Sequence, residues 1–289
     1  MNQKLPDNTL GTLTRYFRSS LEDLYVDREV KQITALVFSE LLGYSRADLT
    51  VKADDKLSES DILKVHFALK KLLKLEPVQY VLGYTEFMDL RLRVTRDVLI
   101  PRPETEELVH WIAERHSADN PTILDVGTGS GCIALGIKKL LPGAEVHGSD
   151  ISESALEVAR ENAESNNLDV TFFQQDALKT ADIGKPIDVI VSNPPYIPLR
   201  DKEEMSSLVF DNEPNVALFV DDSDELIFYY RIVNHALINL KPGGTLFFEL
   251  HEKNDEAVKS IMESAGFEKV ELKLDMQEKP RMIKGVKPV

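Results

Sequence analysis

The hydrophobic positions in the first quarter of the chain recur at helical spacing. The runs are Leu13, Phe17, Leu21 and Leu24; Ile33, Leu36, Val37 and Leu41; and Leu63, Phe67, Leu69, Leu72 and Leu73. Apolar residues three and four positions apart form one face of a helix. Gly43 follows the second run as a typical helix stop, and Ser58 with Asp61 resembles a helix start. The pattern predicts a small helical domain over residues 1–75.

The period of the pattern changes in the next segment, residues 76–100. Pro77 ends the third helix, because proline disfavours helical geometry in the residue before it. Leu90, Leu92 and Val94 then alternate with two arginines, which is typical of a half-exposed strand. Residues 83–87 are the candidate partner strand, with the turn near residues 88–89. We expect residues 76–100 to form a β-hairpin connector between two domains.

Short apolar runs alternate with helical stretches through the remaining chain, residues 101–289. Seven candidate strands cover residues 122–126, 145–149, 170–173, 187–192, 245–250, 268–274 and 281–286. Helical patterns such as residues 153–166 and 225–240 separate them. This alternation is typical of a parallel sheet covered by helices on both faces. The predicted fold class is therefore α/β, with a Rossmann-like, mostly parallel seven-stranded sheet.

Composition and charge narrow the function classes. The chain is 43% hydrophobic and 29% charged, as in ordinary globular proteins, and no window approaches the roughly 18 apolar residues of a membrane span. Residues 1–7 lack the charged and apolar regions of a secretory signal, and a single cysteine, Cys132, is what we expect of a protein in the reducing cytoplasm. Scattered histidines make a metal site improbable. The net charge of −15 argues against stable nucleic-acid binding, which needs many basic residues.

A glycine-rich loop follows the first strand of the predicted sheet. Residues 125–131 read Asp-Val-Gly-Thr-Gly-Ser-Gly and open a helix. The third glycine comes one residue too early for a dinucleotide fingerprint, and no Lys-Ser/Thr follows as in a phosphate loop. The pattern is similar to that of class I S-adenosylmethionine-dependent methyltransferases; the alternative is a tight turn alone. That resemblance implies cofactor-binding residues Gly127, Thr128, Gly129, Ser130 and Gly131.

Two acidic residues follow the next strands. Asp150 ends the second strand about 20 residues after the loop, where a carboxylate accepts hydrogen bonds from a ribose diol. The alternative for Asp150 is a cap on the helix that begins near Ser152. Asp176 and Ala177 stand where methyltransferases contact adenine, although a lone loop aspartate is a weak signal. Because ligands bind beyond the C-terminal strand ends of such sheets, all these residues are expected at one crevice.

The tetrapeptide Asn193-Pro194-Pro195-Tyr196 follows another apolar strand. Its prolines have no N–H, so the carbonyls of Asn193 and Pro194 are free to face a ligand. An amide nitrogen awaiting methylation carries two N–H groups and needs two acceptors, which the Asn193 side chain and the Pro194 carbonyl can provide. Tyr196 can stack against the flat acceptor. The alternative is a strand terminator with no catalytic role.

With these motifs, the chain resembles the release-factor glutamine methyltransferases, the HemK or PrmC family. The specific signature joins residues 76–83, Glu-Pro-Val-Gln-Tyr-Val-Leu-Gly, and residues 99–106, Leu-Ile-Pro-Arg-Pro-Glu-Thr-Glu, to the tetrapeptide. The resemblance implies S-adenosylmethionine as cofactor, with Asn193 among the residues that bind it. It also implies that Asn193, Pro194 and Tyr196 are catalytic, that residues 193–196 bind the substrate, and that the N5 atom of glutamine in the Gly-Gly-Gln motif is methylated. Arg102 and Glu104 belong to the same pocket or, alternatively, form a helix cap and salt bridge.

The resemblance also implies a partner, and the chain departs from the family pattern at one loop. The partner is a peptide chain release factor, whose body the helical domain would recognise. Residues 220–225, Val-Asp-Asp-Ser-Asp-Glu, stand where relatives carry glycines, so the conformation of this loop stays open. The rivals are an adenine-N6 DNA methyltransferase, which uses the same kind of tetrapeptide, and a non-catalytic translation-factor binding protein. The net charge of −15 disfavours the first, and the intact motifs disfavour the second.

Overall fold

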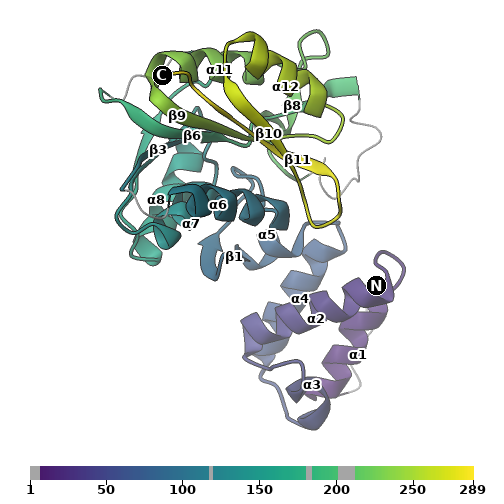
Figure 1. Ribbon diagram of the computed structural model, residues 1–289. Helices are drawn as coiled ribbons and strands as arrows, with labels where there is room; N and C mark the ends of the chain where they lie inside the picture. Colours follow the sequence, from purple (N-terminus) through teal and green to yellow (C-terminus); the bar gives the residue numbers. More distant parts are fainter. Residues whose placement is uncertain (1–6, 117–119, 180–183, 201–211) are drawn as a thin grey trace. The chain divides into compact units, whose positions relative to one another are not determined.

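A computed structural model describes residues 7–116, 120–179, 184–200 and 212–289 of the protein (Figure 1). The chain divides into two compact units. The first comprises Met1–Gly83 with Ser206–Asn212, and the second comprises Tyr84–Met205 with Glu213–Val289. Within the described residues, no helix is long and apolar enough to cross a membrane.

The first unit is helical. Its helices are α1 (Leu10–Leu21), α2 (Asp27–Leu42), α3 (Asp48–Val51), α4 (Glu59–Leu72) and α5 (Val78–Leu82). Phe17 and Phe38 meet edge to face in its core, with ring centroids 5.4 Å apart. The expected stop at Gly43 is confirmed by its left-handed φ of 74°, and the expected start at Ser58 by its cap on the Asp61 N–H at 3.1 Å.

The predicted apolar stripes are only partly buried. Helix α1 ends at Leu21, so Leu24 lies beyond it and is 44% exposed. Phe67 and Leu63 of α4 are also exposed, at 61% and 51%. Leu69 and Leu72 of the predicted stripe are buried, and so is Val65, which the stripe did not include. Spacing alone therefore predicted too wide a stripe.

The hairpin after the first unit is shorter than expected. Strands β1 (Tyr84–Phe87) and β2 (Leu90–Arg93) pair antiparallel, which confirms the predicted partner strands. Met88 and Asp89 both have φ of 52°, as a tight two-residue hairpin turn requires. Residues 78–82, which were assigned to the connector, form helix α5 in the first unit because Pro77 starts a helical turn and Gly83, with φ of 80°, ends it.

The second unit is built on a seven-stranded sheet, as predicted. The strands are β3 (Thr122–Val126), β4 (Glu145–Asp150), β5 (Thr171–Gln174), β6 (Ile187–Ser192), β9 (Leu240–Glu249), β10 (Glu268–Leu274) and β11 (Pro280–Val286). Their order is β10-β11-β9-β6-β3-β4-β5. The pairs from β9 to β5 are parallel, and β11 is antiparallel to both of its neighbours. This is a doubly wound sheet with an antiparallel edge.

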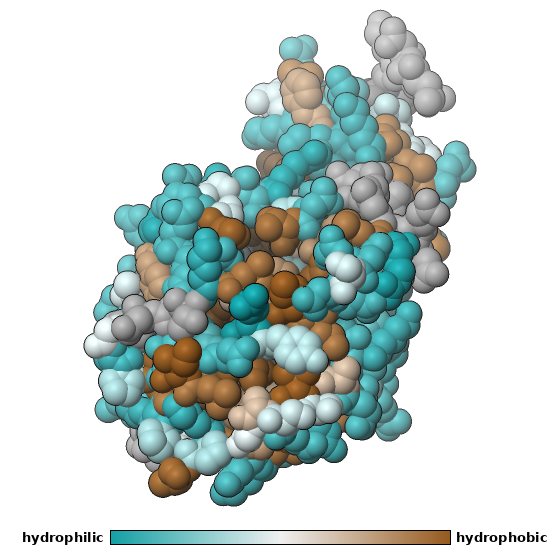
Figure 2. Space-filling model, turned by 90° about the horizontal axis from the view of Figure 1, so that it is seen from above, coloured by the Kyte–Doolittle hydropathy of each residue, from teal (hydrophilic) through white to brown (hydrophobic). Residues whose placement is uncertain are grey.

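Helices cover both faces of this sheet (Figure 1). The helices that pack on it include α6 (Pro103–His116), α7 (Cys132–Leu140), α8 (Glu153–Ser165), α11 (Ile227–Asn239) and α12 (Asp255–Ser264). One core cluster joins α6, α7, α8 and the hairpin to the sheet, and another joins α11 and α12 to it. On the face seen from above, hydrophobic residues are interspersed with hydrophilic ones (Figure 2). The central strands β3 and β6 are therefore buried on both sides, which explains why they read as continuous apolar runs, whereas the edge strands β5 and β10 are largely exposed or half-buried.

Two details of the second unit differ from the sequence expectation. The strand predicted over residues 245–250 begins earlier, because β9 starts at Leu240 and has an irregular register with β6 near Ile187. The short elements β7 (Ile197–Pro198), α10 (Asn215–Leu218) and β8 (Phe219–Val220) were not anticipated. Strands β7 and β8 pair with each other, which ties the chain after Tyr196 to residues 219–220.

Candidate functional site

A cavity of about 300 Å³ opens at the C-terminal ends of the parallel strands. Residues after β3, β4, β5 and β6 line it together, and all of them lie in the second unit. This is the edge at which ligands bind in open α/β sheets. The volume is at the lower end of the range found for small-molecule sites.

The glycine loop forms one wall of the cavity. The three glycines have φ of 77°, 54° and 81° in the order Gly127, Gly129 and Gly131, a region that other residues rarely adopt. The loop is held by the N–H groups of Gly127 and Thr128, which donate to the Ser149 carbonyl at 2.8 and 2.9 Å. Thr128 and Ser130 are buried, and Gly131 starts helix α7. The sequence requirement for glycine is therefore conformational.

A buried carboxylate supports the loop from below. Asp125 is fully buried, and its Oδ2 accepts a hydrogen bond from the Thr128 hydroxyl at 2.5 Å. Desolvation raises the pKa of Asp125 to about 7, against the effect of hydrogen bonds from Thr128 and Ala134. The loop is thus anchored by a side chain of β3 itself.

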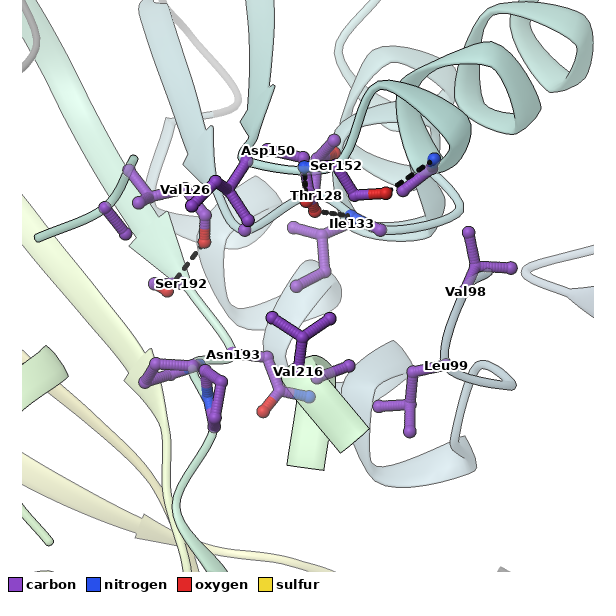
Figure 3. A pocket seen from close by; sticks show the side chains of 18 of the residues that line it. Val98, Leu99, Val126, Thr128, Ile133, Asp150, Ser152, Ser192, Asn193 and Val216 are labelled. Atoms are coloured by element: carbon purple, nitrogen blue, oxygen red, sulfur yellow. Dashed lines mark hydrogen bonds between the residues drawn. The ribbon is translucent and has the colours of Figure 1, made fainter. Parts of the chain in front are cut away.

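Asp150 connects two segments of the cavity wall (Figure 3). Its Oδ2 accepts from the Gly129 N–H and its Oδ1 from the Ser152 N–H, both at 2.9 Å. The helix cap is Ser152, whose hydroxyl accepts from the Ala155 N–H at 3.2 Å. Burial raises the pKa of Asp150, although the backbone hydrogen bonds oppose this shift. Asp150 is therefore free of the capping role that the sequence left open, and it lies at the cavity.

Asp176 and Ala177 line the cavity beyond β5. Asp176 accepts from the Leu178 N–H at 2.9 Å and pairs with Lys179 at 3.2 Å. The backbone hydrogen bond from Leu178 is the largest cause of the lowered pKa of Asp176, so this group is a carboxylate. A loop carboxylate held in this way presents acceptors at the cavity rim.

Asn193, Pro194 and Pro195 line the cavity from the end of β6. The Ser192 hydroxyl donates to the Val126 carbonyl at 2.7 Å, which fastens the end of β6 to β3. The Asn193 amide projects into the cavity near Val216 (Figure 3). Among the described residues, the site brings no group of three His, Cys, Asp or Glu side chains together that could hold a metal ion.

Tyr196 lies beside the cavity instead of in its wall. Its ring packs with the apolar cluster under α11 and α12, 5.6 Å from the His251 ring. Burial raises the pKa of Tyr196 to about 12, so the phenol is neutral. The parallel pairing of β7 with β8 directly after Tyr196 holds the tetrapeptide in place.

Arg102 and Glu104 have different surroundings. Arg102 lines the cavity, and its guanidinium pairs with Glu213 at 2.7 Å. The Glu213 side chain is 1% exposed, and desolvation raises its pKa against the Arg102 charge. Glu104 is in the first turn of α6 and is absent from the cavity wall, although its charge acts on Tyr196. The salt bridge that the sequence left open involves Glu213, not Glu104.

The departure at residues 220–225 forms an ordered turn. Asp221 accepts from the Ser223 N–H at 2.9 Å and from its hydroxyl at 2.6 Å. The Asp222 carboxylate accepts from the Arg200 N–H at 2.8 Å. Acidic side chains therefore stabilise this loop where glycines would leave it unsupported.

Several site residues were missed by sequence reasoning. The apolar part of the wall comprises Val98, Leu99, Ile133, Val216, Phe228 and Ile232. Leu99 stands in the signature stretch and could have been named, whereas Val216 and Phe228 carry no local signal. Thr105 lines the cavity, and Glu249 ends β9 beside β6. Glu249 offered a signal, because it is an acidic residue at the end of an apolar strand, as Asp150 is.

Comparison with family models agrees with both units of the chain. Residues 12–83 match the PrmC N-terminal domain. Residues 104–213 match the methyltransferase small domain. The first match covers the helical unit, and the second covers the part of the sheet unit that contains the glycine loop and the tetrapeptide.

Curated relatives match nearly the whole chain. A release factor glutamine methyltransferase of Flavobacterium psychrophilum is 39% identical over 93% of this chain and 95% of its own length. One of Bacteroides thetaiotaomicron is 41% identical over 95% of this chain and 99% of its own length. Among solved structures, a methyltransferase from Pyrococcus furiosus covers 69% of this chain and 90% of its own, with a TM-score of 0.52 and 20% identity. That last likeness concerns the fold.

Proposed function

This chain belongs to the release factor glutamine methyltransferases, and from that premise we propose that it methylates the side-chain N5 of the glutamine in the Gly-Gly-Gln motif of peptide chain release factors. S-adenosylmethionine is the proposed methyl donor. The observation that carries the proposal is the Asn193-Pro194-Pro195 segment in the wall of one cavity with the glycine loop. Release factors act in the cytoplasm, which is the proposed location.

The cavity wall suits S-adenosylmethionine in its chemistry. The positive-φ glycines bring backbone close to the ligand without side chains, and we assign Gly127, Thr128, Gly129, Ser130 and Gly131 to its amino-acid part. The Asp150 carboxylate has acceptor capacity beyond the bonds from the Gly129 and Ser152 N–H groups, which suits a ribose diol.

The remaining wall suits the base. Asp176 supplies carboxylate acceptors, and Ala177 and Ile133 supply apolar surface, which together match a flat heterocycle with an amino group. When bound, the cofactor supplies an electrophilic methyl group. Asn193 and Pro194 line the same cavity as the residues assigned to the cofactor.

The protein's own contribution is to orient an amide nitrogen. Two N–H groups of the glutamine side chain donate to the Asn193 Oδ1 and to the Pro194 carbonyl, so the nitrogen is held with its remaining face toward the methyl group. Alignment of this kind lowers the barrier by removing orientational freedom before the reaction. Acceptors placed along both N–H bonds stabilise the positive charge that develops on nitrogen. A substrate without N–H would leave buried carbonyls unpaired, which explains selectivity.

The proton leaves after the methyl group arrives. An amide nitrogen that has acquired a fourth substituent is strongly acidic, so water or a nearby carbonyl suffices as acceptor. Pro195 has no N–H to compete for these oxygens, and Tyr196 closes the segment from the side of the apolar core. Arg102, paired with Glu213, is assigned to the same acceptor pocket, and Glu104 contributes negative charge near Tyr196.

The test replaces Asn193 with alanine. We expect kcat to fall by a factor of about 100 or more, since one of two oriented acceptors is lost, while the cofactor Kd stays within about twofold. Asn239→Ala is the matched control, because Asn239 donates to the His235 carbonyl within α11 and does not line the cavity. Unchanged turnover of Asn193→Ala in assays with labelled cofactor would refute the acceptor role.

The identity of the substrate is tested by offering the enzyme three different methyl acceptors. Release factor carrying the Gly-Gly-Gln motif, the same factor with that glutamine replaced by alanine, and duplex DNA are incubated separately with labelled cofactor. Label only on the intact factor supports the proposal, and label on DNA would favour the adenine-N6 alternative. We propose that residues 1–75 recognise the body of the factor, that residues 76–100 connect them to the catalytic part, and that residues 101–289 carry out the transfer.

A further inference from the structure

Glu249 lies at the end of β9, next to the tetrapeptide. Strands β6 and β9 run parallel, and their register pairs Ser192 with Phe248. The following residues, Asn193 and Glu249, therefore leave neighbouring strands at the same level. This adjacency depends on the strand order, because the two residues are far apart in the sequence.

Glu249 is a buried carboxyl group on which two neighbouring side chains act. It is 4% exposed, and its Oε2 accepts from the Thr105 hydroxyl at 2.7 Å. The Asn193 side chain, at the end of the neighbouring strand, acts on it as a hydrogen-bonding group and lowers its pKa. Thr105 is 2% exposed in the first turn of α6. Burial of a carboxyl group costs free energy unless hydrogen bonds satisfy it, so the position of Glu249 calls for a functional explanation.

A carboxylate accepts hydrogen bonds and cannot donate them. Towards Glu249, Asn193 must therefore present its NH₂ group, and its Oδ1 is left on the opposite side of the amide. Without this constraint the amide could turn over, because its oxygen and nitrogen occupy similar space. A turned amide would present N–H to the N–H of the substrate, which is repulsive.

We infer that Glu249 is a positioning residue that holds the Asn193 amide with its oxygen toward the substrate glutamine, and that Thr105 holds Glu249 in turn. The inference rests on the proposed function, in which the Asn193 Oδ1 accepts from the substrate. It adds two residues, from α6 and β9, to a site that the tetrapeptide alone would place on β6. Glu249 acts through Asn193 and does not touch the reacting atoms.

The protonation state of Glu249 links this device to pH. Its surroundings comprise Glu104 and Thr105 of α6, Cys132 of α7, Asn193 and Tyr196 after β6, Tyr229 of α11 and Arg281 of β11. Desolvation raises the pKa of Glu249 to about 7, while Thr105, Arg281 and Asn193 oppose the shift. A protonated Glu249 can donate to the Asn193 oxygen and release the constraint. Activity should therefore rise with pH through about 7.

The decisive variant is Glu249→Gln, which keeps the shape but offers both donors and acceptors. We expect kcat with release factor to fall about 10-fold or more, with the cofactor Kd within about twofold of wild type. The pH dependence of kcat/KM for the cofactor reports on ionisations of the free enzyme. In wild type this profile should rise near pH 7, and we call this rise the limb; in Glu249→Gln the limb should be absent. Glu271→Gln on β10 is the control, since Glu271 pairs with Lys284 away from the cavity.

Thr105→Val is the second variant and covers the case in which Glu249→Gln fails to fold. Loss of the hydroxyl donor destabilises the charged form of Glu249, so the limb should move to higher pH. An unmoved limb in Thr105→Val, or a Glu249→Gln variant with wild-type kcat and limb, would overturn the inference. Wild-type protein that leaves release factor unmethylated would instead refute the proposed function, so the two failures are distinguishable.

Discussion

Replacing Asn162 with alanine removes a side chain that fastens the hairpin to the glycine loop. Asn162 lies on α8 and is 1% exposed. Its Oδ1 accepts from the Arg93 N–H at 2.6 Å, and its Nδ2 donates to the Arg93 carbonyl at 3.0 Å and to the Ser130 carbonyl at 2.9 Å. One amide thus pairs with the backbone of β2 as a neighbouring strand would and also holds the loop at the cavity.

The expected loss follows from these three bonds. At about 1 kcal/mol each they contribute about 3 kcal/mol, and a buried carbonyl left unpaired at Ser130 adds about 1 kcal/mol or more. Asn162→Ala should therefore lower the free energy of unfolding by about 3–5 kcal/mol. For a unit of this size, that corresponds to a decrease in Tm of roughly 10 °C. Asn162→Asp should be at least as harmful, because a carboxylate would face two carbonyl oxygens.

The assay is equilibrium urea denaturation, with a thermal melt as the second measurement. Asn166→Ala is the matched control, because Asn166 is one helical turn further on, donates to the Arg91 carbonyl at 3.0 Å and is only partly buried. We expect that control to lose about 1 kcal/mol or less. If Asn162→Ala lost no more than Asn166→Ala, the structural role assigned to the buried amide would be wrong.

Three further predictions concern the cofactor end of the site. Gly131→Ala should destabilise the protein by about 1–3 kcal/mol, because φ is 81° and the new Cβ would lie 3.2 Å from Ala159 and Phe172; Gly129→Ala, with nothing within 4 Å, should lose less in the same thermal melt. Asp150→Asn should raise the cofactor Kd about 10-fold with a smaller change in kcat, and an unchanged Kd in calorimetry would contradict the ribose assignment. The free energy of unfolding of the wild type should fall as pH rises from about 4 to 7, because the folded protein binds the Asp125 proton more tightly than the unfolded chain does. Asp125→Asn should remove up to about 4 kcal/mol of that pH dependence, as measured by urea titrations at each pH.

The sheet could be predicted because its signals are local. Strands covered on both faces must be apolar along their length, so residues 122–126 and 187–192 were located to the residue. The ends of β9 were less accurate, because the irregular pairing at Ile187 lets a Pro-Gly-Gly segment continue a strand. The exposed face of α4 was misjudged, because only packing decides which apolar residues of a helix are covered.

The sequence by itself determined the residues whose chemistry is local: glycines where φ must be positive, prolines without donors, and polar side chains directly after apolar strands. Such residues act through their own backbone geometry, so neighbours in the sequence reveal them. Only the tertiary structure decided that Asn193 meets Glu249 and that Asn162 holds both β2 and the glycine loop. Asn193 and Glu249 are 56 positions apart in the sequence, and Asn162 is 69 positions from Arg93 and 32 from Ser130. Strand order and register bring these residues together, and no local sequence pattern encodes either of them.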